Sequence, residues 1–227
     1  MMMLVEQRIE ADAARVYEVL CRDGLALLPT DVGYGLVAME EGAVERLYEL
    51  KGRPLSKPCI TVANAAIFDD LVLPVDRATR EWIADVVTRT PLALIGELNP
   101  RSTLLASMSP YVREQATQAG TIATFQSAGH LVQRVADLAF ADGRVIVGSS
   151  ANLSGTGNNY RFEDVPESMR AGANITLNYG PAWYASDERL ATTILDLRDG
   201  RFQRKGVNFA RIEQSWKELQ RMESLAS

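Results

Sequence analysis

The chain has 227 residues, 47% of them hydrophobic and 23% charged, a mixture typical of globular proteins and unlike that of disordered, collagen-like or coiled-coil chains. No run of about 18 apolar residues occurs, so no membrane span is expected. The net charge of −5 disfavours a protein that wraps nucleic acid by bulk charge. Two cysteines fit a reducing, cytoplasmic environment. The single histidine cannot build a histidine-rich metal site, so we expect no protein-bound metal.

The first half of the chain alternates helical and strand patterns. Residues 12–22 place apolar side chains on one helical face, with Asp12 as the expected N-terminal cap. The apolar run 25–28 predicts a short buried strand, and the turn-forming residues 29–35 predict a loop after it. The pattern then predicts a helix that Pro54 stops, a strand at 59–63, a helix at 76–88 and a strand at 92–95.

The second half repeats this alternation. We expect strands at 121–125, 145–147, 174–177 and 193–197, and helices at 130–141 and 163–171. Helices interleaved with apolar strands predict a sheet covered on both faces. The sequence therefore predicts one α/β domain over residues 1–210, followed by a helical tail, 211–227, with an apolar face of Ile212, Trp216 and Leu219.

The segment 33–38 matches the glycine pattern of a dinucleotide-binding turn, Gly-x-Gly-x-x-Ala. Such a turn needs a strand that ends on the first glycine and a helix that begins there. Here the predicted strand ends earlier, and Lys57 and Pro58 stand where an acidic, ribose-binding residue belongs. We attribute the match to chance.

A cationic loop, residues 51–58, lies between a predicted helix and a predicted strand and carries Lys51, Arg53 and Lys57. One explanation is structural, because cations are favourable at a helix C-terminus. The other is functional, because two prolines stiffen the loop and a guanidinium matches phosphate oxygens. In that case Lys51 and Arg53 point together at a polyanion.

Small polar residues, 149–155, follow the predicted strand 145–147. Open α/β sheets bind ligands at the carboxyl ends of their strands, and hydroxyls and backbone N–H groups in a turn can surround a phosphate. The structural alternative is an ordinary Asn/Ser turn. The later Arg204-Lys205-Gly206 follows a predicted strand and is, by itself, a charged turn.

Four motifs in this order resemble the YrdC-like family, which includes the L-threonylcarbamoyladenylate synthases and the YciO-like proteins. They are Pro-Thr-Asp-x-x-Tyr-Gly at 29–35, Lys-x-Arg-Pro at 51–54, Ser-Ala-Asn-x-Ser-Gly at 150–155 and Arg-x-Gly at 204–206. The resemblance implies a twisted mixed sheet with helices on both faces and a central, positively lined cavity. It also implies that threonine, bicarbonate and ATP react to threonylcarbamoyl-AMP and pyrophosphate, for threonylcarbamoyladenosine modification of tRNA.

The resemblance also implies roles for single residues on the nucleotide side of that cavity. Lys51 and Arg53 would contact the triphosphate and act in catalysis. Ser150 and Asn152 would hold the nucleotide and the reacting carbonyl, and Arg204 would approach the nucleotide from the far side. Mg²⁺ would arrive with ATP as part of the substrate.

On the side of the small substrate, the resemblance implies that Thr30, Tyr34 and Thr192 line the end where the amino acid and the carbamate lie. The expected partners are ATP, threonine and bicarbonate, together with tRNA or proteins of tRNA modification.

The chain departs from the family pattern on this side. Val32 replaces a threonine of the first motif. Ala93 replaces a threonine in the predicted strand 92–95, and Phe125 replaces an arginine at the end of the predicted strand 121–125. We therefore expect ATP to bind while threonine binds weakly or is replaced by another ligand.

Three functions remain open at the level of sequence. The chain can be an active carbamoyladenylate-forming enzyme, or a YciO-like relative that binds a nucleotide or phosphate with low activity or another substrate. Phe125 in place of arginine favours the second. The third is an RNA-binding module, for double-stranded RNA or the ribosome, which the acidic balance disfavours. It would need a basic patch drawn from Arg198, Arg201, Arg204, Lys205 and Arg211.

Overall fold

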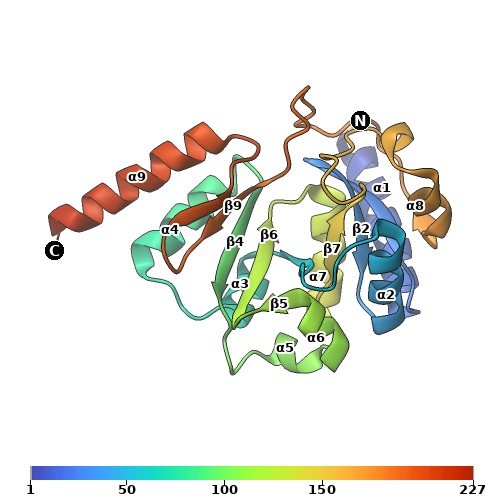
Figure 1. Ribbon diagram of the computed structural model, residues 1–227, viewed down its shortest axis with the longest axis horizontal. Coiled ribbons are helices and arrows are strands. Elements are labelled where there is room, and N and C mark those ends of the chain that lie inside the picture. Colours follow the sequence, from blue (N-terminus) through green and yellow to red (C-terminus); the bar gives the residue numbers. More distant parts are fainter. Residues whose placement is uncertain (1, 227) are drawn as a thin grey trace.

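The computed structural model describes residues 2–226, and the side chains of residues 5–225. Its centre is a twisted, mixed sheet of ten strands (Figure 1). The strands are β1 (Ala26–Thr30), β2 (Gly33–Ala38), β3 (Ile60–Ala63), β4 (Leu92–Glu97), β5 (Thr117–Gln118), β6 (Thr121–Gln126), β7 (Val147–Ser150), β8 (Ile175–Thr176), β9 (Thr193–Asp196) and β10 (Arg201–Arg204). Their order is β10-β9-β4-β6-β3-β7-β2-β1-β8, and β5 pairs with β6 outside this path.

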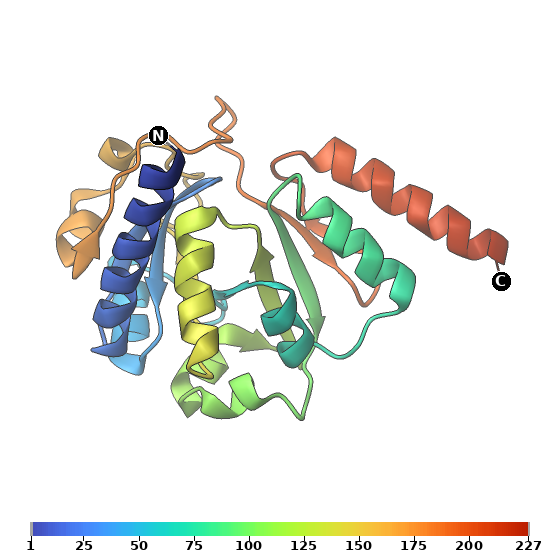
Figure 2. The same ribbon diagram turned by 180° about the vertical axis from the view of Figure 1, so that it is seen from behind.

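Helices cover both faces of this sheet, as expected. They are α1 (Met2–Cys21), α2 (Glu41–Lys51), α3 (Ala65–Leu71), α4 (Arg77–Val86), α5 (Thr103–Ser107), α6 (Pro110–Ala116), α7 (His130–Ala141), α8 (Glu167–Gly172) and α9 (Phe209–Ala226). One face carries α1, α3, α4 and α7 (Figure 2), and the other carries α2 and α8 (Figure 1). None of the helices among residues 2–226 is long and apolar enough to cross a membrane.

The start of α1 is a correction to the sequence prediction. The helix begins at Met2 rather than at residue 12, and Asp12 is not its cap. Asp12 instead lies within the helix, where it pairs with Arg8 (3.6 Å) and Arg15 (3.0 Å). These partners stand one turn away on either side, where helical neighbours meet, so a carboxylate is tolerated mid-helix.

The second correction concerns the segment 33–38, part of which we predicted as a loop. It forms β2, which pairs antiparallel with β1, from Thr30 opposite Gly33 to Ala26 opposite Val37. Gly33 has φ +130°, which only glycine adopts easily, and so lets the chain reverse after Asp31 and Val32. A dinucleotide-binding turn leads from a strand into a helix. This segment is itself an antiparallel strand, so its glycine pattern is a chance match.

Several boundaries and short elements also differ from prediction. β7 continues through Ser149 and Ser150, which pair with Leu36 and Gly35, so these serines belong to the sheet rather than to a loop after it. The terminal helix α9 begins at Phe209, two residues before the predicted tail. The patterns did not reveal α3, α5 and α6, which are too short to show a helical period. Each is fixed by a capping side chain, namely Asn64, Ser102 and Ser109.

Replacing the glycine of the β1–β2 turn is expected to destabilise the protein. A Cβ on residue 33 would lie 2.9 Å from Asn159 O, at a φ that L-residues avoid. We expect Gly33→Ala to lower the free energy of unfolding by more than about 1 kcal/mol in urea titrations. Gly52→Ala is the matched control, because Gly52 also has positive φ but nothing lies within 4 Å of an added Cβ. Equal losses in the two variants would contradict a contribution from the close approach to Asn159.

Candidate functional site

A cavity of about 280 Å³ lies against one face of the sheet. Its floor is apolar and is built from alternate residues of neighbouring strands, which point to the same side of a sheet. Val62 of β3 is the register partner of Phe125 in β6, and Ala123 of β6 is the partner of Ile95 in β4. All four line the cavity. The sheet register therefore sets the shape of this floor.

Two arginines line this cavity. Among the described residues that line it, only Arg53 and Arg204 carry a charge. Arg53 donates from Nε to Lys57 O (3.1 Å) and from Nη2 to Pro58 O (2.6 Å), which fixes the cationic loop. Arg204 donates from Nε to Thr192 O (2.8 Å). Two guanidinium groups with no carboxylate beside them form a site for an anion.

The surroundings of Arg204 support this interpretation. The residue as a whole is exposed, yet it lines the cavity, and its guanidinium is partly desolvated there. Desolvation, and after it the positive charge of Arg53, lowers the pKa of Arg204. A bound polyanion would relieve both effects.

Lys51, expected at the triphosphate, is only 2% exposed and does not line the cavity. Its ammonium donates to Asn152 O (2.7 Å) and to Ser150 O. Burial, and then the charge of Arg53, lowers the pKa of Lys51 to about 8. In this structure Lys51 joins the end of α2 to the small polar residues 149–155. Its contact with a triphosphate stays a prediction.

The two residues of the Ser-Ala-Asn motif are placed differently. Ser150 ends β7 and lines the cavity. Asn152 is buried and does not line it; its Nδ2 donates to Leu153 O (2.8 Å). Its Oδ1 has no hydrogen bond within the described part of the chain. That oxygen is therefore an acceptor still open to a donor.

Thr30, Tyr34 and Thr192 all line the cavity, and each hydroxyl lies close to other protein atoms. Thr30 Oγ1 donates to Gly33 O (2.6 Å) and so closes the β1–β2 turn. The Tyr34 hydroxyl lies 2.9 Å from Asn178 Oδ1 and 2.8 Å from Gly180 O, so this ring also anchors the segment after β8. The structure thus brings the three together, without testing their role toward a substrate.

Two of the three positions at which the chain departs from the family pattern line the cavity. Val32 and Phe125 line the cavity, and Ala93 is buried on β4 as the register partner of Phe125. This end of the cavity is consequently apolar, where a threonine and an arginine would have offered a hydroxyl and a charge.

Sequence reasoning missed a second layer of polar residues. Asn158 lines the cavity and donates from Nδ2 to Val32 O (2.6 Å), and Asn159 donates from Nδ2 to Ala151 O (2.7 Å). Arg189 donates to Asn158 O (2.8 Å) and to Asn159 Oδ1. These bonds fasten the loop after the Ser-Ala-Asn motif to the β1–β2 turn. The two adjacent asparagines directly after that motif were the available signal.

The basic patch required for RNA binding is partly neutralised. Arg198 pairs with Asp196 at 2.7 Å, and Arg201 pairs with Asp199 at 3.8 Å. Arg204 belongs to the cavity. The structure therefore offers no specific support for the RNA-binding alternative.

A sequence profile decides the family. The Sua5/YciO/YrdC profile, described as "Telomere recombination", matches residues 18–206. The chain belongs to the Sua5/YciO/YrdC family. This match confirms the resemblance that the four motifs indicated. Among curated proteins, no sequence matches the chain significantly.

Solved structures share the fold of this family member. A hypothetical protein from Streptococcus mutans, smu.1377c, superposes with a TM-score of 0.77 at 17% identity, over 89% of this chain and 90% of its own. E. coli YciO gives 0.62 at 17% identity, over 87% and 90%. P. abyssi Sua5, solved with L-threonine, gives 0.70 at 23% identity over 87% of this chain. This chain spans only 54% of that Sua5.

Proposed function

We propose that this family member is an enzyme that binds ATP, with Mg²⁺, in the cavity and forms a carbamoyl adenylate with release of pyrophosphate. The observation that carries the proposal is the pair Arg53 and Arg204 at an apolar-floored cavity of about 280 Å³, with the Ser150 segment on its wall. That volume lies just below the range of roughly 300–1,000 Å³ for small-molecule sites.

The chemistry asks little of the protein beyond positioning and charge. An amine and bicarbonate give a carbamate, whose oxygen attacks the α-phosphorus of ATP and displaces pyrophosphate. Negative charge accumulates on the phosphoryl oxygens during this displacement, so fixed cations and backbone donors supply most of the stabilisation. Arg53 and Arg204 are placed for that role. Lys51 acts as a positioning residue through its bonds to Ser150 O and Asn152 O.

L-Threonine is the first amino acid to test, because the Sua5 neighbour was solved with it. The apolar side chains of Val32 and Phe125 in the cavity wall argue for weak binding of threonine, or for a less polar amine in its place. The departures from the family pattern at Val32, Ala93 and Phe125 therefore favour a YciO-like enzyme that turns over another substrate slowly.

The test is bicarbonate-dependent release of pyrophosphate from ATP, measured across a panel of amino acids that includes threonine, valine and alanine. We expect release with at least one amine, and loss of that release in Arg53→Ala. Arg201→Ala is the control, because this exposed arginine lies outside the cavity. Release that is absent for every amine, or that survives in Arg53→Ala, would argue against the proposal.

Restoring one hydroxyl at the apolar end should improve the binding of threonine. Val32→Thr keeps the side-chain shape and returns a hydrogen-bonding group to the cavity wall. One recovered bond is worth about 1 kcal/mol, so we expect threonine affinity, measured by calorimetry with ATP present, to rise by roughly fivefold. An unchanged affinity in a folded variant would mean that Val32 is not what limits threonine binding.

A further inference from the structure

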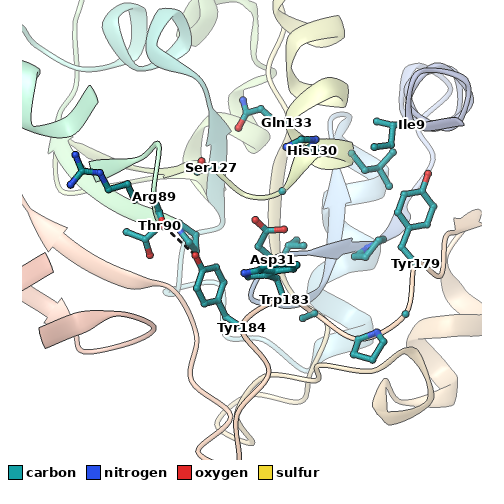
Figure 3. A pocket seen from close by; sticks show the side chains of 18 of the residues that line it. Ile9, Asp31, Arg89, Thr90, Ser127, His130, Gln133, Tyr179, Trp183 and Tyr184 are labelled. Atoms are coloured by element: carbon teal, nitrogen blue, oxygen red, sulfur yellow. Dashed lines mark hydrogen bonds between the residues drawn. The ribbon is translucent and has the colours of Figure 1, made fainter. Parts of the chain in front are cut away.

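A second cavity of about 530 Å³ lies next to the first, and Thr30 lines both. It opens where β1 ends, between the start of α7, the turn before β4 and the segment Tyr179–Tyr184 (Figure 3). No element of the function proposed above uses it.

Backbone hydrogen bonds hold the walls of this second cavity in place. Asp31 N donates to Ala128 O (3.0 Å), and Tyr184 N donates to Asp31 O (2.9 Å). The Tyr34 hydroxyl reaches Gly180 O from the side of the first cavity. Asp31, directly after β1, therefore joins the residues before α7 to the segment Tyr179–Tyr184. These bonds shape the cavity before any ligand arrives.

Asp31 provides the negative charge of this cavity. Its side chain is the only carboxylate among the described residues that line it, and no hydrogen bond to that carboxylate occurs in the described part of the chain. Gly129 lies beside it: a Cβ there would approach Asp31 Oδ1 to 2.8 Å, at a φ of +114° that L-residues rarely adopt. Burial raises the pKa of Asp31, while His130 lowers it. A partly buried carboxylate without a donor is best stabilised by a cation.

Aromatic side chains stand around this carboxylate. Trp183 is 83% exposed, lines the cavity and directly precedes Tyr184, whose backbone N–H donates to Asp31 O. Tyr184 donates from its hydroxyl to Arg89 O (3.2 Å), which fixes its ring on the wall. The guanidinium of Arg89 pairs with Asp85 and points away from Asp31, so it is not a partner of that carboxylate (Figure 3). Cations bind well over the faces of tryptophan and tyrosine.

We propose that the second cavity binds an organic cation, a guanidinium or primary ammonium group on an aliphatic stem, with its charge held by Asp31 and by the ring of Trp183. The net charge of −5 favours the approach of such a ligand. The proposal also gives a role to Asp31, the charged side chain of the Pro-Thr-Asp motif, which does not line the first cavity. The group can come from a free polyamine-like molecule or from an arginine side chain of a protein partner.

The test is calorimetric titration of the full chain with two cationic probes. Agmatine represents the free molecule, and the peptide acetyl-Gly-Arg-Gly-amide represents a side chain; acetyl-Gly-Gln-Gly-amide is the neutral control. We expect one or both cationic probes to bind and to change the fluorescence of Trp183, and the neutral peptide to do neither. Which probe binds more tightly identifies the source of the group.

Two variants make the assignment specific. Asp31→Asn should weaken the binding of the cationic probe by about tenfold or more, the usual loss for a hydrogen bond to a charged group. Its unfolding midpoint should stay at the wild-type value, because the carboxylate holds nothing in place. Trp183→Ala, a change at an exposed residue, should weaken binding by about threefold or more. Glu188→Gln removes an exposed carboxylate outside the cavity and should change nothing.

Three results would overturn the proposal. The first is equal binding of the cationic probe by Asp31→Asn and wild type. The second is binding of the neutral peptide as tightly as the arginine peptide. The third is binding of guanosine, whose base edge also fits a carboxylate, without binding of either cation. None of these measurements involves ATP turnover, so they stand apart from the function proposed for the first cavity.

Discussion

The double variant Arg53→Ala/Arg204→Ala is expected to bind ATP at least about a hundredfold more weakly than the wild type. Each guanidinium makes charge-assisted bonds worth about 1.5–3 kcal/mol, and the two face the same cavity. Because Arg53 lowers the pKa of Arg204, the two charges interact, so the effects of the single variants should not simply add. Calorimetric titration with ATP and Mg²⁺ measures each single variant and the pair.

The control for this pair is Arg198→Ala/Arg201→Ala, which removes the same number of positive charges outside the cavity. These arginines pair with Asp196 and Asp199 rather than facing a ligand. An equal loss of ATP affinity in the control would mean that general electrostatic attraction, rather than the cavity, accounts for the effect.

The buried lysine should make stability depend on pH in a particular direction. The pKa of Lys51 is about 8 in the folded chain, against 10.5 for an ordinary lysine. Between these values the unfolded chain holds more protons than the folded chain, so the free energy of unfolding rises with pH. The gain from pH 7 to pH 9.5 should be about 2 kcal/mol for this group alone.

Lys51→Met isolates that contribution. Burial raises the pKa of Cys59, which gives the opposite slope in the same range, so the quantity to measure is the difference between wild type and Lys51→Met. Urea unfolding at pH 7 and pH 9.5 should show the wild type gaining about 2 kcal/mol relative to the variant. A difference that does not change with pH would contradict a buried ammonium at this position.

Much of the fold follows from hydrophobic periodicity. The helix over 130–141 agrees with α7, because its apolar residues recur at helical spacing along its whole length. β2 was harder to predict, since its glycines and its position after a proline-containing segment indicate a turn. Only its pairing with β1 and β7 makes it a strand, and that pairing is tertiary information.

The candidate site, like the fold, could be predicted from the sequence only in part. Motif order placed Arg53, Ser150 and Arg204 at one cavity, because the family resemblance carries their arrangement. It could not show that Lys51 bends back to two backbone carbonyls, since sequence spacing does not fix the direction of a long flexible side chain. Nor could it reveal the second cavity, whose walls come from five separate parts of the chain.

The central claim is that the arginine-lined cavity holds a nucleotide, and thermal unfolding of the wild-type chain with ATP and Mg²⁺ tests it most directly. A ligand that binds only the folded state stabilises it by RT ln(1 + [L]/Kd), about 2.7 kcal/mol at a hundredfold excess over Kd. We predict a Kd for ATP in the micromolar-to-millimolar range usual for enzyme substrates, seen as a rise of the melting temperature with ATP concentration. A melting temperature that no nucleotide raises, up to millimolar concentrations, would contradict the claim.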